Sequence, residues 1–120
     1  MNPFRELVAE IINQAVDDLK LCDKGLSLFE ARRLLHWFMG SLPKPHIAFE
    51  ACCDELGLDA EDLRSRLKVP ELLAALDRDQ SVENLTRELK SARLEVRRLA
   101  RAAKRKGAAA RPVRGEARAG

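Results

Sequence analysis

The chain has 120 residues, with 22 Lys/Arg against 19 Asp/Glu and a formal net charge of +3. This length allows one domain and an appendage. We find no apolar run long enough to cross a bilayer and no secretory leader, so membrane and secreted disulfide-rich classes are not expected. We expect a cytoplasmic protein with free thiols. Abundant Leu, Ala, Arg, Glu and Lys favours an all-α fold.

The small net charge hides a strong polarity along the chain. Residues 1–80 carry ten Lys/Arg and fifteen Asp/Glu, whereas residues 81–120 carry twelve Lys/Arg and four Asp/Glu. The sequence therefore describes an acidic body with a basic arm. Such an arm suits a polyanion, an acidic protein surface or the chain's own acidic body.

Two helices are predicted in the first forty residues. Asn2 and Pro3 suit the start of the first helix. Its apolar residues recur at steps of three and four: Phe4, Leu7, Val8, Ile11, Ile12, Ala15, Val16 and Leu19. Ser27 and Glu30 form a capping-box pattern that starts a second helix, and Gly40 stops it.

The stretch from Phe49 to Leu67 predicts two short helices joined by a tight turn. Gly57 can end the first helix in the left-handed conformation, and Asp59 can cap the second. This arrangement is typical of a helix-turn-helix and equally of a plain structural hairpin. Acidic residues at the start of the second helix would repel phosphates. Its basic residues, which we expect to face a nucleic acid, are Arg64, Arg66 and Lys68.

Residues 70–106 hold one further helix or two, because residues 77–80 interrupt the apolar pattern without Gly or Pro. From residue 82 the apolar residues follow a heptad pattern. The proposed self-association residues are Val82, Leu85, Leu89, Ala92, Val96 and Leu99, followed by Ala103. The pattern leaves two alternatives open: a second copy pairs with this helix, or the helix packs on its own body.

The arm is the strongest candidate for binding a polyanion. Its proposed phosphate-binding residues are Arg93, Arg97, Arg98, Arg101, Lys104, Arg105 and Lys106. Like charges one turn apart destabilise a helix, and a phosphate backbone would relieve that repulsion. The predicted organisation is a four- to five-helix domain over 1–77, a long helix over 81–106 and a disordered basic tail over 107–120.

No catalytic or metal-binding motif is found. Cys52 and Cys53 are adjacent and would point about 100° apart on a helix, so both cannot easily bind one zinc ion. We interpret them as buried thiols, their role left open, and expect no enzyme activity, metal or cofactor.

Residues 27–68 also resemble a known group of proteins. The resemblance rests on Trp37, on Phe49-x-x-Cys52 and on Leu56-Gly57-Leu58-Asp59-x-x-x-Leu63-Arg64. This pattern is similar to that of small helical proteins of phages and bacteria, in which a Trp-containing helix precedes such a hairpin. The resemblance implies a helix-turn-helix-like domain that binds DNA or regulates transcription.

The function predicted from the sequence is a small, non-enzymatic DNA-binding or transcription-regulatory protein. Its hairpin and basic arm would contact duplex DNA, with a possible homodimer and a possible protein partner such as the transcription machinery. The alternative is a protein-protein interaction module that dimerises or docks through the 82–103 helix and binds no nucleic acid. DNA, RNA and an acidic protein remain open as partners, and no membrane association is expected.

Overall fold

The computed structural model describes residues 3–41 and 47–119, with side chains as far as Arg105. These residues form helices and connections without a strand, which confirms the all-α fold. The helices are α1 (Pro3–Asp18), the 3-10 helix η1 (Leu19–Cys22), α2 (Leu28–Met39), α3 (Phe49–Leu56), α4 (Ala60–Arg66), α5 (Val69–Asp77), α6 (Glu83–Glu88) and α7 (Lys90–Ala119).

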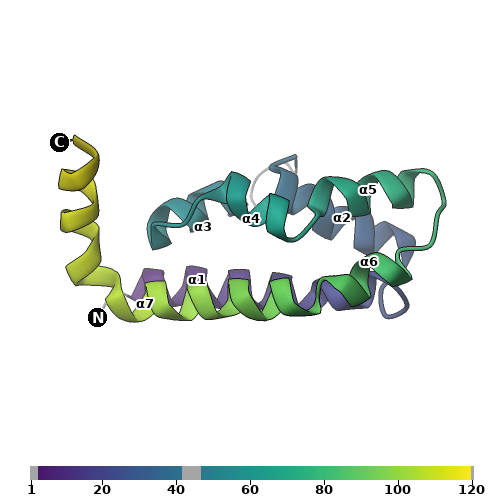
Figure 1. The fold of residues 1–120 in the computed structure, drawn as a ribbon, viewed down its shortest axis with the longest axis horizontal. Helices are drawn as coiled ribbons and strands as arrows, with labels where there is room; N and C mark the ends of the chain where they lie inside the picture. Colours follow the sequence, from purple (N-terminus) through teal and green to yellow (C-terminus); the bar gives the residue numbers. More distant parts are fainter. Residues whose placement is uncertain (1–2, 42–46, 120) are drawn as a thin grey trace.

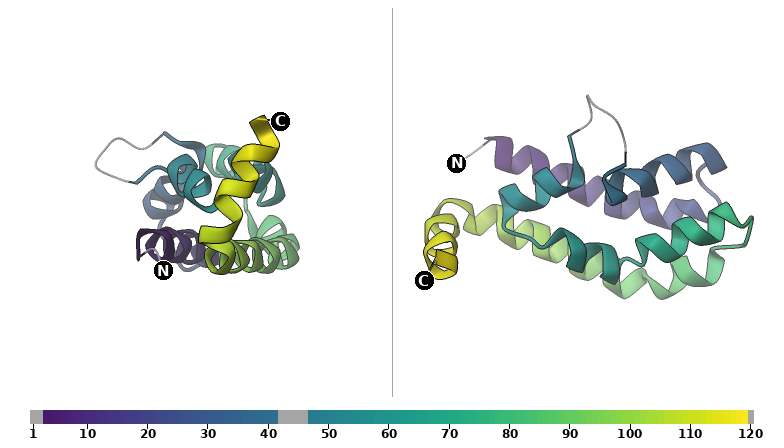
Figure 2. Two further views of the ribbon diagram at one scale, coloured as in Figure 1. Left: turned by 90° about the vertical axis from the view of Figure 1, so that its left-hand side faces the viewer. Right: turned by 90° about the horizontal axis from the view of Figure 1, so that it is seen from above.

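The helices are arranged in two layers (Figure 1). Helices α1 and α7 lie side by side and run in opposite directions, and α2 to α5 form the second layer above them. The end-on view in Figure 2 shows the same two layers. The most extensive contacts join α1 to α7, α2 to α5 and α1 to α3. Each layer buries its apolar side against the other, as packed helices must.

The core is built from side chains of both layers. Its largest fully buried members are Phe38, Phe49, Ile12, Leu19, Leu35, Leu63, Leu67, Leu72 and Leu89. The rings of Trp37, Phe38 and Phe49 meet edge to face, with centroids 5.0–5.3 Å apart. That geometry is favoured for aromatic pairs. The cluster lies between α2 and α3, because Trp37 and Phe38 belong to α2 and Phe49 belongs to α3.

The helix ends follow the predicted cap chemistry. The Ser27 hydroxyl accepts from the Glu30 backbone N–H, and the Glu30 carboxylate accepts from that of Ser27, which completes the capping box. Gly40 ends α2 at φ 80° and Gly57 ends α3 at φ 73°, where a residue with a Cβ would be strained. The Asp59 carboxylate caps α4 by accepting from two backbone N–H groups.

Residues 70–106 fold as three helices, a division that the sequence left open. Asp79 adopts a left-handed conformation at φ 58°, and the Gln80 backbone N–H donates to the Ala75 carbonyl at 2.8 Å. An aspartate thus ends α5 where glycine is usual. The Thr86 hydroxyl donates to the backbone carbonyls of Val82 and Glu83 at the start of α6, and Leu89 separates α6 from α7.

The heptad stripe packs inside the chain. Val82, Leu89 and Val96 are at most 3% exposed, and helix α7 lies along α1. The stripe therefore serves as an intramolecular seam in this structure, which is the second of the two alternatives. A dimer through the same residues would require α7 to leave α1.

Arg5 links the two ends of the described fold. Its buried guanidinium donates to the backbone carbonyls of Glu55 in α3 and Ala103 in α7. It also forms an ion pair with the Glu55 carboxylate at 3.5 Å. One side chain of α1 thus fixes the positions of two other helices. Helix α7 continues to Ala119, so the backbone over 107–119 is helical in this structure, whereas the sequence predicts a disordered basic tail over 107–120.

Candidate nucleic-acid interface

The α3–α4 hairpin has the predicted turn, but its principal arginine is part of the core. Arg64 is 8% exposed. Its Nε donates to the Phe38 carbonyl at 2.5 Å, and its two terminal nitrogens contact the carboxylates of Glu50 at 2.9 Å and Glu61 at 3.0 Å. The guanidinium carbon also lies 5.5 Å from the centre of the Phe49 ring.

These contacts remove Arg64 from the predicted DNA-binding surface. Burial disfavours its charge, but hydrogen bonds to Glu50 and Glu61 outweigh that effect and raise the pKa of Arg64. All three nitrogens of the guanidinium already have acceptors. A phosphate would have to displace them, so we correct the prediction: Arg64 joins α4 to α2 and α3.

The rest of α4 is a poor phosphate-binding surface. Arg66 forms an ion pair with Asp62 at 2.8 Å, one turn earlier in the same helix. Glu61 and Asp62 are exposed at the start of α4. Lys68 is half-buried in a left-handed conformation at φ 52°, between α4 and α5. The predicted recognition helix therefore presents more carboxylates than unpaired cations.

Part of the basic arm folds onto the acidic body. Arg97 lies 3.4 Å from the Asp17 carboxylate, and Lys104 lies 4.0 Å from that of Glu10. Arg93 and Arg97 are half-buried, and the Nε of each is buried without a hydrogen-bond partner. These three side chains occupy the flank of α7 that faces α1. Arg97 and Lys104 therefore neutralise carboxylates of α1 and offer less positive charge to an outside anion.

The opposite side of α7 carries an exposed cationic strip. Its exposed residues are the cations Lys90, Arg98, Arg101 and Arg105, with Leu94 between the first two. Steps of four, four, three and four residues place them in one line along the helix. Among the described side chains, Arg101 and Arg105 form no ion pair. Lys106, also predicted to bind phosphate, lies outside the described side chains.

One carboxylate lies beside this strip. Glu95 accepts hydrogen bonds from Arg98 at 2.6 and 3.2 Å. That contact lowers the pKa of Glu95, and the charge of Arg66 lowers it further. The Arg66 guanidinium, at the end of α4, is thus close enough to Glu95 to stabilise its charged form. Arg98 is exposed and can exchange its carboxylate partner for a phosphate.

Lys90 belongs to the strip but was not among the predicted binding residues. Lys90 lies eight residues before Arg98 in the sequence. Two steps of four residues place both on the same side of a helix, so the sequence contained this signal.

The described part of the chain offers no metal site. No group of three or more metal-ligating side chains is found among these residues. Cys22, Cys52 and Cys53 are buried, and burial raises the pKa of the first two to about 11 and that of Cys53 to about 12. Thiols with such pKa values are largely protonated and unreactive at neutral pH.

Comparison of the chain with protein-family models, with curated proteins and with solved structures gives no match. The resemblance of residues 27–68 to small phage and bacterial proteins therefore stays a prediction. Among the described helices, none combines the length and apolar composition needed to cross a membrane.

Proposed function

We propose that the protein binds duplex DNA through phosphate contacts from the exposed cationic strip of α7, independently of base sequence. The observation that carries this proposal is the exposure of Arg98, Arg101 and Arg105 on one side of α7. The other side of the same helix is buried against the body, with Val96 and Ala100 fully covered. The strip is therefore held on a packed helix.

The dimensions of the strip suit a phosphate backbone. Fifteen residues separate Lys90 from Arg105, which corresponds to about 22 Å along a helix. Charged side chains at one-turn intervals can follow phosphates along a groove edge, and phosphate contacts position a protein without reading sequence. The buried Arg64 and the acidic start of α4 argue against base readout by the hairpin.

This proposal keeps the DNA partner of the sequence-based prediction and changes the binding surface. The alternative prediction is an interaction module that dimerises or docks through the 82–103 helix and binds no nucleic acid, and it has less support because Val82, Leu89 and Val96 of that helix are buried within the chain. A regulatory role in transcription needs sequence selectivity, for which the described surface offers no basic recognition helix.

The test is a titration of a labelled duplex of about 20 base pairs at several salt concentrations. Three to five phosphate contacts predict a slope of log K against log salt of about −3 to −4.5. The triple variant R98E/R101E/R105E should show no measurable binding, even at the lowest salt concentration. A single-stranded DNA and an RNA duplex in the same titration show which nucleic acid binds best.

The matched control changes exposed cations elsewhere. Lys24 lies in the connection before α2, Arg78 is the C-terminal cap of α5, and both side chains are exposed. The variant K24E/R78E should bind the duplex with an unchanged salt slope. The proposal is wrong if the triple variant and the control bind equally, or if the wild-type protein binds no nucleic acid at low salt.

A further inference from the structure

Helix α1 has a second apolar line outside the core. The buried line includes Val8 and Ile12, both fully covered. Phe4, Leu7 and Ile11 follow at steps of three and four, on the adjacent side of the helix. Phe4 is 47% and Leu7 is 50% exposed, although both belong to the apolar pattern that the sequence shows for this helix. The fold thus leaves a hydrophobic ridge at the surface.

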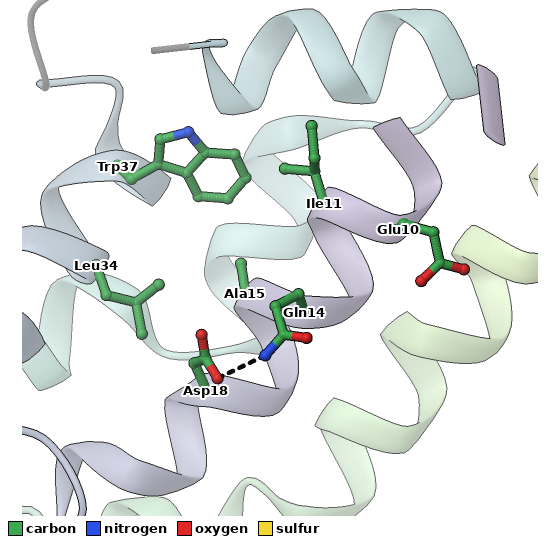
Figure 3. A pocket seen from close by; sticks show the side chains of 7 residues that line it. All are labelled: Glu10, Ile11, Gln14, Ala15, Asp18, Leu34 and Trp37. Carbon is green, nitrogen blue, oxygen red and sulfur yellow. Dashed lines mark hydrogen bonds between the residues drawn. The ribbon is translucent and has the colours of Figure 1, made fainter. Parts of the chain in front are cut away.

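The ridge leads into a groove between α1 and α2. The hollow has a volume of about 390 Å³ and is lined by Glu10, Ile11, Gln14, Ala15, Asp18, Leu34 and Trp37. In Figure 3 the side chains of Leu34 and Trp37 face Ile11 and Ala15 across it. A hydrogen bond of 2.7 Å from Trp37 Nε1 to the Ile47 carbonyl holds the indole in place.

The polar edge of this groove is acidic. Gln14 donates to the Asp18 carboxylate at 2.9 Å, and both lie at the rim (Figure 3). Glu10 also lines the groove; its side chain is 69% exposed, points to the α7 side in Figure 3 and forms an ion pair with Lys104 at 4.0 Å. Within the lining of the groove there is no Lys, Arg or His. An apolar floor with an acidic rim selects a ligand that is apolar on one side and basic beside it.

We propose that the ridge and groove bind a basic amphipathic helix of a partner protein. From Phe4 to Asp18 the surface runs for about 21 Å, the length of about four helical turns. Helix-in-groove binding uses apolar anchors at one-turn spacing, and carboxylates at the rim favour Lys or Arg beside them. The described helices of a second copy do not fit, because the apolar side of α7, the basic helix, is already buried on α1.

Trp37 reports directly on occupancy of the groove. The chain has one Trp and no Tyr, so its emission comes from this side chain alone. The probes are two synthetic helical peptides without aromatic residues: one of Leu, Ala and Lys, the other with Glu at every Lys position. We expect the Lys peptide to shift Trp37 emission in a saturable manner, and the Glu peptide to leave it unchanged at the same concentrations.

Three variants test the contacts. Leu7→Ser should weaken the Lys peptide about fivefold to tenfold, because a half-exposed leucine would be covered on binding. Leu28→Ser is the matched control, since Leu28 is 53% exposed on α2 outside this groove. The double variant E10K/D18K should reverse the preference for the Lys peptide, so that the Glu peptide binds more tightly than the Lys peptide. Circular dichroism verifies that each variant retains its helices.

Several outcomes would overturn the proposal. Equal responses to the two peptides would show that charge does not determine which peptide binds. No response to either peptide at about 1 mM would show that the groove does not bind such a helix. Equal losses in the Leu7 and Leu28 variants would place binding elsewhere. Sedimentation that shows dimers dissociated by the Lys peptide would identify a second copy as the occupant. None of these results depends on whether α7 binds DNA.

Discussion

The α3–α4 hairpin and the outer side of α7 both carry arginines, yet the two regions use them differently. In the hairpin, Arg64 is buried with two carboxylates, a backbone carbonyl and an aromatic ring around it. On α7, Arg101 and Arg105 are exposed and have no ion pair with a described side chain. The comparison teaches that an arginine becomes structural when neighbouring helices supply acceptors, and remains available when they do not.

The largest expected effect comes from Arg64→Met. Loss of the guanidinium leaves the buried Phe38 carbonyl without its donor and removes the contact with the Phe49 ring. The free energy of unfolding should fall by about 2–3 kcal/mol. Glu50 and Glu61 are more than half exposed and regain water, so they add little to this loss. Urea denaturation followed by circular dichroism measures it.

Arg66→Met is the control for this prediction within the same helix. Arg66 has one exposed ion pair with Asp62, and such pairs contribute less than about 1 kcal/mol. A loss as large in the Arg66 variant as in the Arg64 variant would show that charge alone, and not burial, accounts for the role of Arg64.

A second effect concerns the buried thiols of the hairpin. Burial raises the pKa of Cys52 from its ordinary value of 9.0 to about 11. The folded state therefore binds this proton more tightly than the unfolded state. Its stabilising contribution is complete below about pH 9 and is lost as the pH rises towards 11. The unfolding free energy should fall over that interval by roughly 2 kcal/mol for this thiol.

Comparison of the wild-type protein with Cys52→Ala isolates this contribution, because the titration of the lysines is common to both. The decline of stability above about pH 9 should be shallower in the variant. Parallel curves would mean that the Cys52 thiol ionises as readily in the folded protein as in the unfolded chain.

A third and smaller effect is expected at the turn of the hairpin. Gly57 lies at φ 73°, so Gly57→Ala should lower the unfolding free energy by about 1 kcal/mol. Gly57→Asn should cost less, because asparagine adopts the left-handed conformation more readily. The order Gly, Asn, Ala in urea midpoints checks the prediction, and an alanine variant as stable as asparagine would contradict it.

The smallest effect on stability is expected for Arg101→Met on α7. Because the side chain is exposed and has no described ion pair, the unfolding free energy should change by less than about 0.5 kcal/mol. Affinity for duplex DNA should nevertheless fall, and the salt slope should become shallower by about 1. This result, beside that of Arg64→Met, would separate a binding arginine from a structural one. A marked loss of stability without loss of binding would reverse the assignment.

The local signals in the sequence predicted helix ends well. The capping box of Ser27, the glycine stops at Gly40 and Gly57, and the cap at Asp59 depend on residues within four positions of one another. The break after α5 was not predictable in the same way, because Asp79 takes the conformation usually given to glycine. Such a choice depends on how the following helices pack.

Long-range contacts account for the remaining differences. The carbonyl that accepts from Arg64 Nε belongs to Phe38, 26 residues earlier, and periodicity within α4 gives no sign of it. The exposure of Phe4 and Leu7 likewise follows from which side of α1 receives α3 and α7. A helical apolar stripe predicts that a helix has a buried side, but it does not give the width of the surface that its neighbours cover.

The bond from Arg5 to the Ala103 carbonyl also has a consequence for biosynthesis. The two residues are 98 positions apart, so α1 emerges from the ribosome long before the helix that covers it. Contacts between distant parts of a chain form late and slow folding. Until α7 has been made, the side of α1 that it covers stays open to chaperones or to aggregation. A chain terminated before Lys90 would keep that exposure permanently, and we expect cells to degrade it.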